Sequence, residues 1–228
     1  MDENFLAGRV LIVFGGAGAL GTAVVEKALA VGATVTVADA TLPEPGARHS
    51  AVRYLTVDAL DEQSVKSCFD DAPWAVVNTI GRFTVGQAVA DLDLSVLRRQ
   101  FELNLLTAAT ITKHAVKSIK RTGVGGRIVH TSSSVATHDG HGEFSDSVTK
   151  LAVVRLVEAT AAEVRDDDIT VNCVMPKVID SPENRAAMPK ADFSTWPRAS
   201  QIADVIAFLA SDASVLVSGT AIPVYGRA

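Results

Sequence analysis

Cysteines, a basic charge excess and long apolar runs are scarce or absent in this chain, and each shortage argues against a class of protein. The two cysteines among 228 residues, Cys68 and Cys173, lie far apart and form no Cys-x-x-Cys pair. Their spacing indicates neither a zinc site nor a disulfide framework, so no metal is expected. The formal net charge of -5 gives no basic field to attract a phosphate backbone, and nucleic acid is not an expected partner. A small-molecule substrate or ligand is favoured instead.

The apolar run at 10–14 has only the length of a β-strand. A membrane-spanning helix needs about 20 apolar residues, so this run is far too short to cross a bilayer. The first residues after the methionine are Asp2 and Glu3, and no basic segment of the kind that opens a secretory signal is present. We expect a cytoplasmic protein that makes no membrane contact.

Short β-branched runs alternate with longer helical stretches, which is typical of βαβ units around a parallel sheet. The predicted strands are 10–14, 34–38, 53–57, 75–78, 127–131, 170–174 and 220–224. The predicted helices are 20–31, 61–69, 94–120, 146–164 and 199–210. A chain of this length commonly forms one domain. We therefore predict that residues 1–228 form a single Rossmann-type, doubly wound α/β domain with a seven-stranded parallel sheet flanked by helices.

Two stretches interrupt this alternation. Residues 42–50 are rich in Pro and Gly and read as the loop after the second strand. Residues 179–197 follow the sixth strand and contain three prolines without a clean periodicity. This segment lies where such folds bind ligands, outside the carboxyl ends of the strands, so it is a candidate lid over a substrate site.

A glycine-rich turn, Phe14-Gly-Gly-Ala-Gly-Ala-Leu-Gly, follows the first strand and leads into a helix. Glycines there allow a tight turn and a close approach of backbone N–H groups to a pyrophosphate, which then lies at the positive end of the helix. The residues expected to contact a dinucleotide here are Gly15, Gly18, Ala19, Leu20 and Gly21. The alternative is a purely structural turn, since many such turns contain glycine.

Asp39 ends the second strand, about twenty residues beyond the glycine turn. A carboxylate in this place can accept hydrogen bonds from both hydroxyls of an adenosine ribose and would repel a 2′-phosphate. The spacing therefore predicts NAD(H) in preference to NADP(H), although Asp39 could also simply begin a turn. Asp58, followed by Ala59 after the third strand, would suit a hydrogen bond to the adenine amino group.

With these residues assembled, the chain resembles the short-chain dehydrogenase/reductase family over nearly its whole length. The family's T-G-x-x-x-G-x-G motif maps onto residues 14–21, and its N-N-A-G motif is similar to Asn78-Thr-Ile-Gly81. The glycine turn and residues 180–196 more narrowly resemble the dihydropteridine reductases within this family. The resemblance implies that Asn78, Gly81, Pro176, Ile179 and Ser181 also line the dinucleotide site.

In this family an Asn, a Ser, a Tyr and a Lys carry catalysis. The resemblance places the asparagine at Asn104, where it helps to hold a water in a proton relay, and the lysine at Lys150, where it binds the nicotinamide ribose. The serine corresponds to Ser134 by its local sequence and to Ser133 by its spacing from position 146, and Ser134 is preferred. The alternative for Asn104 is an asparagine in a helix that bonds nearby backbone.

The tyrosine position is occupied by Asp146, and the chain's two tyrosines, Tyr54 and Tyr225, lie elsewhere. An aspartate with a reference pKa of about 3.9 is normally ionised beside a lysine and cannot donate the proton that carbonyl reduction requires. One interpretation of Asp146 is a helix N-cap, and another is a general base. The proton donor could then be an ordered water, the substrate itself, or one of the loop residues His138, His141 and Glu143.

Three hypotheses follow for the activity. The leading one is an atypical, ketoreductase-like oxidoreductase that interconverts a carbonyl and a hydroxyl of a small molecule with NAD(H). The second is a non-redox enzyme on the same scaffold, which catalyses a dehydration, cyclisation or isomerisation. The third is a dinucleotide-binding protein without turnover. The apolar helices 94–120 and 146–164, together with the family's helix pairing, predict a homodimer or homotetramer.

Overall fold

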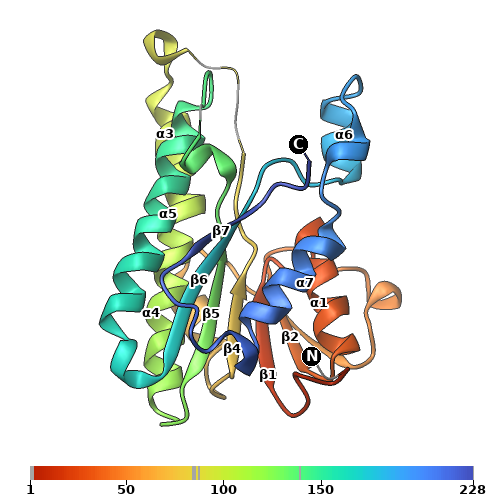
Figure 1. The fold of residues 1–228 in the computed structure, drawn as a ribbon, viewed down its shortest axis with the longest axis vertical. Coiled ribbons are helices and arrows are strands. Elements are labelled where there is room, and N and C mark those ends of the chain that lie inside the picture. The colour runs from red at the N-terminus through yellow and green to blue at the C-terminus, as the bar shows by residue number, and fades with distance from the viewer. Residues whose placement is uncertain (1–2, 84–85, 87, 139, 228) are drawn as a thin grey trace.

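Seven parallel strands form the centre of the molecule, as the alternating pattern predicts. The structure is a computed structural model, and it describes residues 3–83, 86, 88–138 and 140–227. The strand order is β3-β2-β1-β4-β5-β6-β7, with every neighbouring pair parallel (Figure 1). The strands are β1 (Val10–Phe14), β2 (Thr34–Asp39), β3 (Val52–Thr56), β4 (Ala75–Asn78), β5 (Gly126–Thr131), β6 (Ile169–Pro176) and β7 (Ala221–Val224).

Helices cover both faces of this sheet, so the central strands are buried on both sides. The helices are α1 (Ala19–Ala30), α2 (Glu62–Ser67), α3 (Leu94–Gln100), α4 (Thr107–Lys120), α5 (Phe144–Glu163), α6 (Pro182–Ala187) and α7 (Ala199–Leu209). Figure 1 shows α1 and α7 over one face and α4 and α5 over the other. All eight residues of β6 are buried, which explains its nearly continuous apolar sequence.

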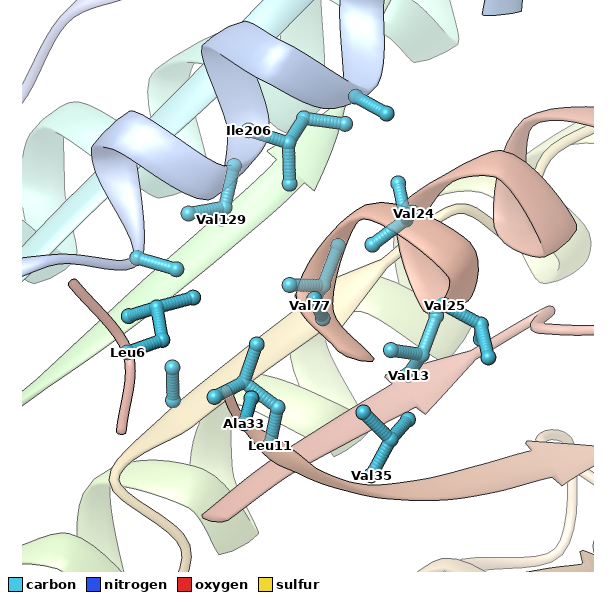
Figure 2. Packing of buried hydrophobic residues seen from close by; sticks show 14 of the residues in the cluster. Leu6, Leu11, Val13, Val24, Val25, Ala33, Val35, Val77, Val129 and Ile206 are labelled. Atoms are coloured by element: carbon cyan, nitrogen blue, oxygen red, sulfur yellow. The ribbon is translucent and has the colours of Figure 1, made fainter. Parts of the chain in front are cut away.

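The side chains of β1 alternate between two hydrophobic cores, because successive residues of a strand point to opposite faces. Leu11 and Val13 enter the core beneath α1 and α7, where Val24 and Ile206 also pack (Figure 2). Ile12 and Phe14, which alternate with them along the strand, enter the other core, beneath α4 and α5. The two cores hold the helices in place around the carboxyl edge of the sheet.

The chain passes from β1 outward to β2 and β3, then returns to place β4 on the opposite side of β1. Such a reversal leaves a crevice between the loops at the carboxyl ends of the two strands, where open α/β sheets bind ligands. The loops after β1 and β4 meet there, and the start of α5 approaches from the side of β5. In the described part of the chain, no helix combines the length and the apolarity that crossing a membrane requires.

Apart from small shifts at helix ends, the structure departs from the predictions at three points. Residues 94–120 are helical throughout, but the segment Phe101–Leu106 between α3 and α4 is a π-helix. Helix α5 begins at Phe144, two residues before the predicted start. The lid candidate at 179–197 is partly ordered into α6 rather than being a plain loop.

Candidate active site

The glycine turn after β1 folds in a way that side chains would prevent. Gly15 has a φ of +76°, a region that other residues rarely adopt, and a Cβ at Gly21 would overlap the carbonyl oxygen of Gly15. Helix α1 begins directly after the turn, with Gly18 as an N-cap that provides no side-chain hydrogen bond. The N–H groups of the first helical turn are therefore left for an anionic ligand. Leu20 can offer only its backbone, because its side chain is 7% exposed and packs in the core.

Asp39 is fixed against this turn by its carboxylate. One carboxylate oxygen accepts the N–H of Ala17 at 3.0 Å, and the other accepts the N–H of Thr41 at 3.2 Å. The contact with Thr41 is local and matches the alternative that Asp39 begins a turn. The contact with Ala17 instead joins residues 22 positions apart and ties Asp39 to the glycine turn. The sequence-predicted partners of one dinucleotide site are thus joined directly.

Asp58 and Ala59 lie beyond β3, on the outer side of Asp39. Asp58 is exposed, and its carboxylate accepts the N–H of Leu60 at 2.9 Å while its own N–H donates to Ser64 Oγ at 3.1 Å. The helix that follows is capped by Asp61, whose side chain accepts the N–H of Gln63. Asp58 is therefore held in an exposed turn between β3 and α2.

The end of β4 is held by a buried histidine that sequence reasoning did not single out. Asn78 lies 3.2 Å from His130 Nδ1 through its amide nitrogen, and its amide oxygen accepts the N–H of Ile80 at 3.0 Å. On the other side of the ring, Thr112 Oγ1 lies 2.9 Å from Nε2. Burial lowers the pKa of His130 to about 4, so the ring is neutral at pH 7. The only sequence signal was a histidine within the apolar strand that became β5.

Three segments converge beside Gly81. A Cβ at this glycine would lie 2.6 Å from Lys150 Nζ and 3.3 Å from Asn104 Oδ1, so the ammonium and the amide both lie against the loop after β4. Lys150 is buried, and this burial lowers its pKa, while the charges of Asp146 and Cys173 oppose the shift. The structure therefore brings three of the predicted site residues to one place.

Asn104 lies in the π-helical segment, a feature often found at functional sites. Its Oδ1 accepts the N–H of Arg82 at 2.8 Å and its Nδ2 donates to the carbonyl of the same residue at 3.1 Å. Nδ2 also contacts Gln100 at 2.7 Å and Thr149 at 3.0 Å. The backbone that Asn104 bonds is 22 residues away in the chain, which differs from the local bond considered for a mid-helix asparagine.

The serines at the end of β5 occupy a short turn. Ser134 begins the 3-10 turn Ser134–Ala136 and is 9% exposed, whereas Ser133 precedes it in extended conformation and is half-buried. The neighbouring Ser132 donates its hydroxyl to the carbonyl of Lys150 at 2.9 Å, which ties the strand to α5. The preference for Ser134 over Ser133 stays a prediction.

The prediction that Asp146 caps a helix is wrong. Helix α5 begins at Phe144 with Glu143 as the N-cap residue, so Asp146 is already the third residue of the helix. Its side chain is 0% exposed, and neither carboxylate oxygen has a hydrogen-bond partner among the described residues. Burial raises the pKa of Asp146 to about 6, against the opposing charge of Lys150 and with a small contribution from Glu143. A carboxyl enclosed in this way cannot touch a substrate unless the protein moves.

Among the alternative proton donors, His138 makes the most polar contacts with other described residues. Its Nδ1 lies 3.1 Å from the carbonyl oxygen of Ser134 and 3.4 Å from the hydroxyl of Tyr225. His141 is exposed, and together with Phe144 it lines a cavity of about 750 Å³ that Ala88 and Val89 border on the other side. Tyr225, which follows β7, was absent from the predicted site because no local motif surrounds it.

The predicted lid begins with a compact group of hydrogen-bonded residues around the start of α6. Ser181 caps α6 by accepting the N–H of Asn184 at 3.2 Å, and the Asn184 side chain donates to the carbonyl of Ile179 at 2.8 Å. Asp180 forms a two-pronged ion pair with Arg185. Pro176 ends β6 just before this group of residues. Two of the predicted dinucleotide contacts, Ile179 and Ser181, therefore belong to one ordered unit at the carboxyl edge.

Comparisons with known proteins agree with this architecture. The family model described as enoyl-(acyl carrier protein) reductase matches residues 15–226. A cis-4-hydroxycyclohexanecarboxylate dehydrogenase of Sinomonas cyclohexanicum is 30% identical, over 99% of this chain and 98% of the relative. The (+)-cis,cis-nepetalactol synthase NEPS3 of Nepeta racemosa is 28% identical, over 99% of this chain and 93% of the relative.

A short-chain type dehydrogenase/reductase from Mycobacterium ulcerans has a similar solved structure, with a TM-score of 0.86 and 25% identity. The match covers 97% of this chain and 90% of that protein. The chain therefore belongs to the short-chain dehydrogenase/reductase family, and it is an enzyme of this oxidoreductase family. Members of the family bind NAD(P)(H) and act on small molecules.

Proposed function

We propose that this chain is an oxidoreductase that interconverts a carbonyl and a hydroxyl of a small molecule with NAD(H), in preference to NADP(H). The observation that carries the proposal is the hydrogen bond between Asp39 and Ala17, which joins the predicted ribose-binding carboxylate to the glycine turn. The turn itself fits a pyrophosphate, since a Cβ at Gly21 would fill the space that its fold requires. A bound nicotinamide would supply or accept the hydride.

Each remaining residue then has a definite task. Lys150 is the buried cation beside Gly81, and it binds the ribose hydroxyls next to the nicotinamide. Asn104 holds the loop after β4 and helps to order a water in the proton relay. Asn78, Pro176, Ile179 and Ser181 line the nicotinamide end, whereas Asp58 and Ala59 line the adenine end. Ser134 orients the substrate oxygen, and the segment 179–197 covers the substrate.

Asp146 takes the place of the family's tyrosine in this proposal, but not its role. The carboxyl is enclosed, so its contribution is electrostatic: it lies one helical turn before Lys150 and opposes the effect of burial on that ammonium. A general acid must come within about 3 Å of the atom that it protonates. The proton for carbonyl reduction therefore comes from another group.

A second candidate is a non-redox enzyme that uses Asp146 as a general base. Two observations favour it: a similar protein is named as a nepetalactol synthase, and a carboxyl whose pKa is raised to about 6 is a better base at neutral pH than an ordinary aspartate. This reaction would require the carboxyl to become accessible when substrate binds. It would not consume dinucleotide.

Titration of the protein with NADH and NADPH, followed by fluorescence, tests the first step. We expect NADH to bind more tightly, and tighter binding of NADPH would contradict the cofactor preference. Turnover is then sought with NAD+ and cis-4-hydroxycyclohexanecarboxylate, and with NADH and a panel of ketones and a dihydropteridine, the last because of the loop resemblance. Binding of NADH without redox turnover on any of these compounds would favour a binding protein. Absence of binding would favour the non-redox enzyme.

We also propose that the chain forms a homodimer or homotetramer through α4 and α5. Large apolar side chains are exposed on α5 and on the helical stretch that leads into α4, and they are Leu94, Leu106, Phe144, Val148 and Leu151. Such faces usually pair around a two-fold axis. Light scattering should report an oligomer at micromolar concentration, and Leu151→Glu should shift it toward monomer because Leu151 is 49% exposed on α5. The control Val124→Glu, at an exposed turn before β5, should leave the mass unchanged, and a monomeric wild-type chain would refute the proposal.

A further inference from the structure

Carbonyl reduction needs a proton as well as a hydride, and the described site does not obtain it from position 146. Asp146 is 0% exposed and has neither the reach nor the accessibility of a phenol. The chain contains two tyrosines, Tyr54 and Tyr225. Tyr54 lies on β3, at the outer edge of the sheet, and its hydroxyl accepts the N–H of His49 at 3.1 Å. Tyr225 instead lies 3.4 Å from His138, which itself contacts the backbone of Ser134.

The fold places Tyr225 at the carboxyl edge of the sheet. It directly follows β7, whose last residue Val224 is in register with Pro176 at the end of β6. The ring packs against the core beneath α4 and α5, the face from which Lys150 also reaches the site. Two residues further, Arg227 donates its backbone N–H to the carbonyl of Thr195 at 3.1 Å. The half-buried phenol thus lies between the lid segment and the serine turn.

Tyr225 meets His138 there. The hydroxyl is 3.4 Å from Nδ1, and the two rings meet edge to face, with their centroids 5.4 Å apart and an interplanar angle of 87°. The same Nδ1 lies 3.1 Å from the carbonyl oxygen of Ser134. Because a carbonyl oxygen only accepts hydrogen bonds, Nδ1 carries the hydrogen in this arrangement. That one hydrogen faces the carbonyl of Ser134 and the hydroxyl of Thr137, both 3.1 Å from Nδ1, and the phenol oxygen lies slightly farther away at 3.4 Å. Because a protonated Nδ1 accepts no hydrogen bond, the phenol does not donate to it, and its own proton remains available.

We propose that Tyr225 is the general acid of this enzyme and that His138 restores its proton, a proposal that rests on the carbonyl reduction proposed above. His138 of this pair is hydrogen-bonded to the backbone carbonyl of Ser134, the preferred substrate-orienting serine. A tyrosine that arrives from the last strand would then replace the one absent from α5. The sequence motif does not reveal it, because 79 residues separate Tyr225 from position 146 and only the sheet brings the two regions together.

The step balances as follows in the direction of reduction. The carbonyl carbon gains a hydride from the reduced nicotinamide, and the π electrons of the carbonyl move to its oxygen. That oxygen takes the phenolic proton of Tyr225 and becomes a hydroxyl. The phenolate takes the Nδ1 proton of His138, and Nε2 of the same ring takes a proton from solvent. In alcohol oxidation each transfer runs in reverse.

A packing role for the pair makes different predictions. If Tyr225 only fills space beside His138, Tyr225→Phe keeps the ring and loses nothing but a weak polar contact. If Tyr225 is the acid, the same change removes the proton and leaves the packing. A packing role also gives no reason for bound NADH to shield the hydroxyl.

Protection against tetranitromethane tests the position of the phenol without a known substrate. In Tyr54→Phe, the remaining phenol is Tyr225, and saturating NADH should slow its nitration about tenfold, as measured by mass spectrometry. The matched control is Tyr225→Phe, in which nitration of Tyr54 should not change with NADH. An equal nitration rate of Tyr225 with and without bound NADH would overturn the pair alone. A chain that binds no NADH by fluorescence would overturn the proposed reduction together with it.

Turnover supplies the second readout. With a substrate from the panel, Tyr225→Phe should lower kcat by about 100-fold, the lower end of the usual contribution of general acid catalysis, while NADH affinity and Tm stay unchanged. His138→Ala should cause a smaller loss that added imidazole restores, which a structural role for the ring does not explain. Unchanged kcat in Tyr225→Phe would overturn the assignment.

Discussion

The two carboxylates at the ends of the crevice, Asp39 and Asp146, have opposite environments. Asp39 is half-buried, and both of its oxygens accept backbone N–H groups, one of them from the glycine turn. Asp146 is fully buried, and its oxygens have no partner among the described residues. A buried polar group without partners costs free energy. The proposed catalytic end, around Asp146, therefore carries a cost that the proposed nucleotide end, around Asp39, does not. The nucleotide end is complete in itself, whereas the catalytic end is arranged for something beyond stability.

The same contrast extends to how each end is built. The nucleotide end depends on glycines, because Gly15 and Gly21 have no side chains and so allow one stretch of backbone to approach another closely. The catalytic end depends on polar side chains from distant segments, among them Asn104, Lys150 and His130. Substitutions should therefore act through backbone geometry at the first end and through buried polarity at the second.

The largest expected effect is at the nucleotide end, in Gly21→Ala. The added Cβ would overlap the carbonyl oxygen of Gly15, so the turn must open and the N–H groups of α1 lose their alignment. We expect NADH affinity to fall more than about 100-fold, which corresponds to about 2.7 kcal/mol of binding free energy. The matched control is Gly46→Ala, where a Cβ would meet nothing within 4 Å. Wild-type affinity in Gly21→Ala, measured by NADH fluorescence, would refute this account of the turn.

An effect of similar size, on stability rather than on binding, is expected for His130 at the other end of the site. Its folded-state pKa of about 4 lies below the unfolded value near 6.5, so the folded protein binds fewer protons between these pH values. The stability contributed by the neutral ring is fully present above pH 6.5 and is lost as the pH falls toward 4. The shift corresponds to about 3 kcal/mol. In urea titrations, His130→Asn should lose this part of the pH dependence.

The exposed His49 provides the control for that experiment, because its ring is not buried. His49→Asn should keep the wild-type dependence of unfolding free energy on pH. Equal pH dependence in His130→Asn and wild type would mean that the ring is not held neutral by burial.

Asp146 should show the opposite dependence. Its folded-state pKa of about 6 lies above the usual value of 3.8 for an aspartate, so the folded protein holds the proton more firmly and stability falls as the pH rises from 4 to 6. Above pH 6 the penalty is complete. Asp146→Asn should therefore stabilise the protein by about 2 kcal/mol at pH 8, with the unpartnered amide reducing the full gain, and by much less at pH 4.

Asp166→Asn is the matched control, since Asp166 is exposed in the turn before β6. Its unfolding free energy should follow that of wild type at every pH. Destabilisation of Asp146→Asn at pH 8 would show that the carboxylate is stabilised by contacts that the structure does not contain.

The smallest effect is expected for Asp39→Asn. The amide keeps an acceptor for the N–H of Ala17 but removes the charge that would repel a 2′-phosphate. The ratio of NADPH to NADH dissociation constants should fall about tenfold, or about 1.4 kcal/mol. Asp58→Asn, farther out at the edge, should change both affinities alike. An unchanged ratio in Asp39→Asn would remove Asp39 as the basis of the preference.

The strands were predictable from local pattern almost residue by residue. Strands β1 and β4 match their predicted bounds, and the other strands differ by one or two residues at their ends. The start of α5 was less predictable. Asp146 looked like a cap because Asp commonly precedes helices, but Phe144 and Ser145 precede it within the first turn. Packing of α5 against the sheet carried Asp146 into the interior, and propensity alone does not describe that.

The sequence by itself determined the doubly wound sheet, and it predicts the nucleotide end of the site. Both depend on signals that are close in the chain: the apolar period of each strand, the glycine turn, and a carboxylate at the end of the next strand. Tertiary structure decided the rest. It buried Asp146 beneath the surface. It also brought together residues from different elements, in the contacts of His130 with Asn78 and of His138 with Tyr225. Such contacts form only when the strand order and the helix packing are in place, because they depend on which segments are adjacent in space rather than in the chain.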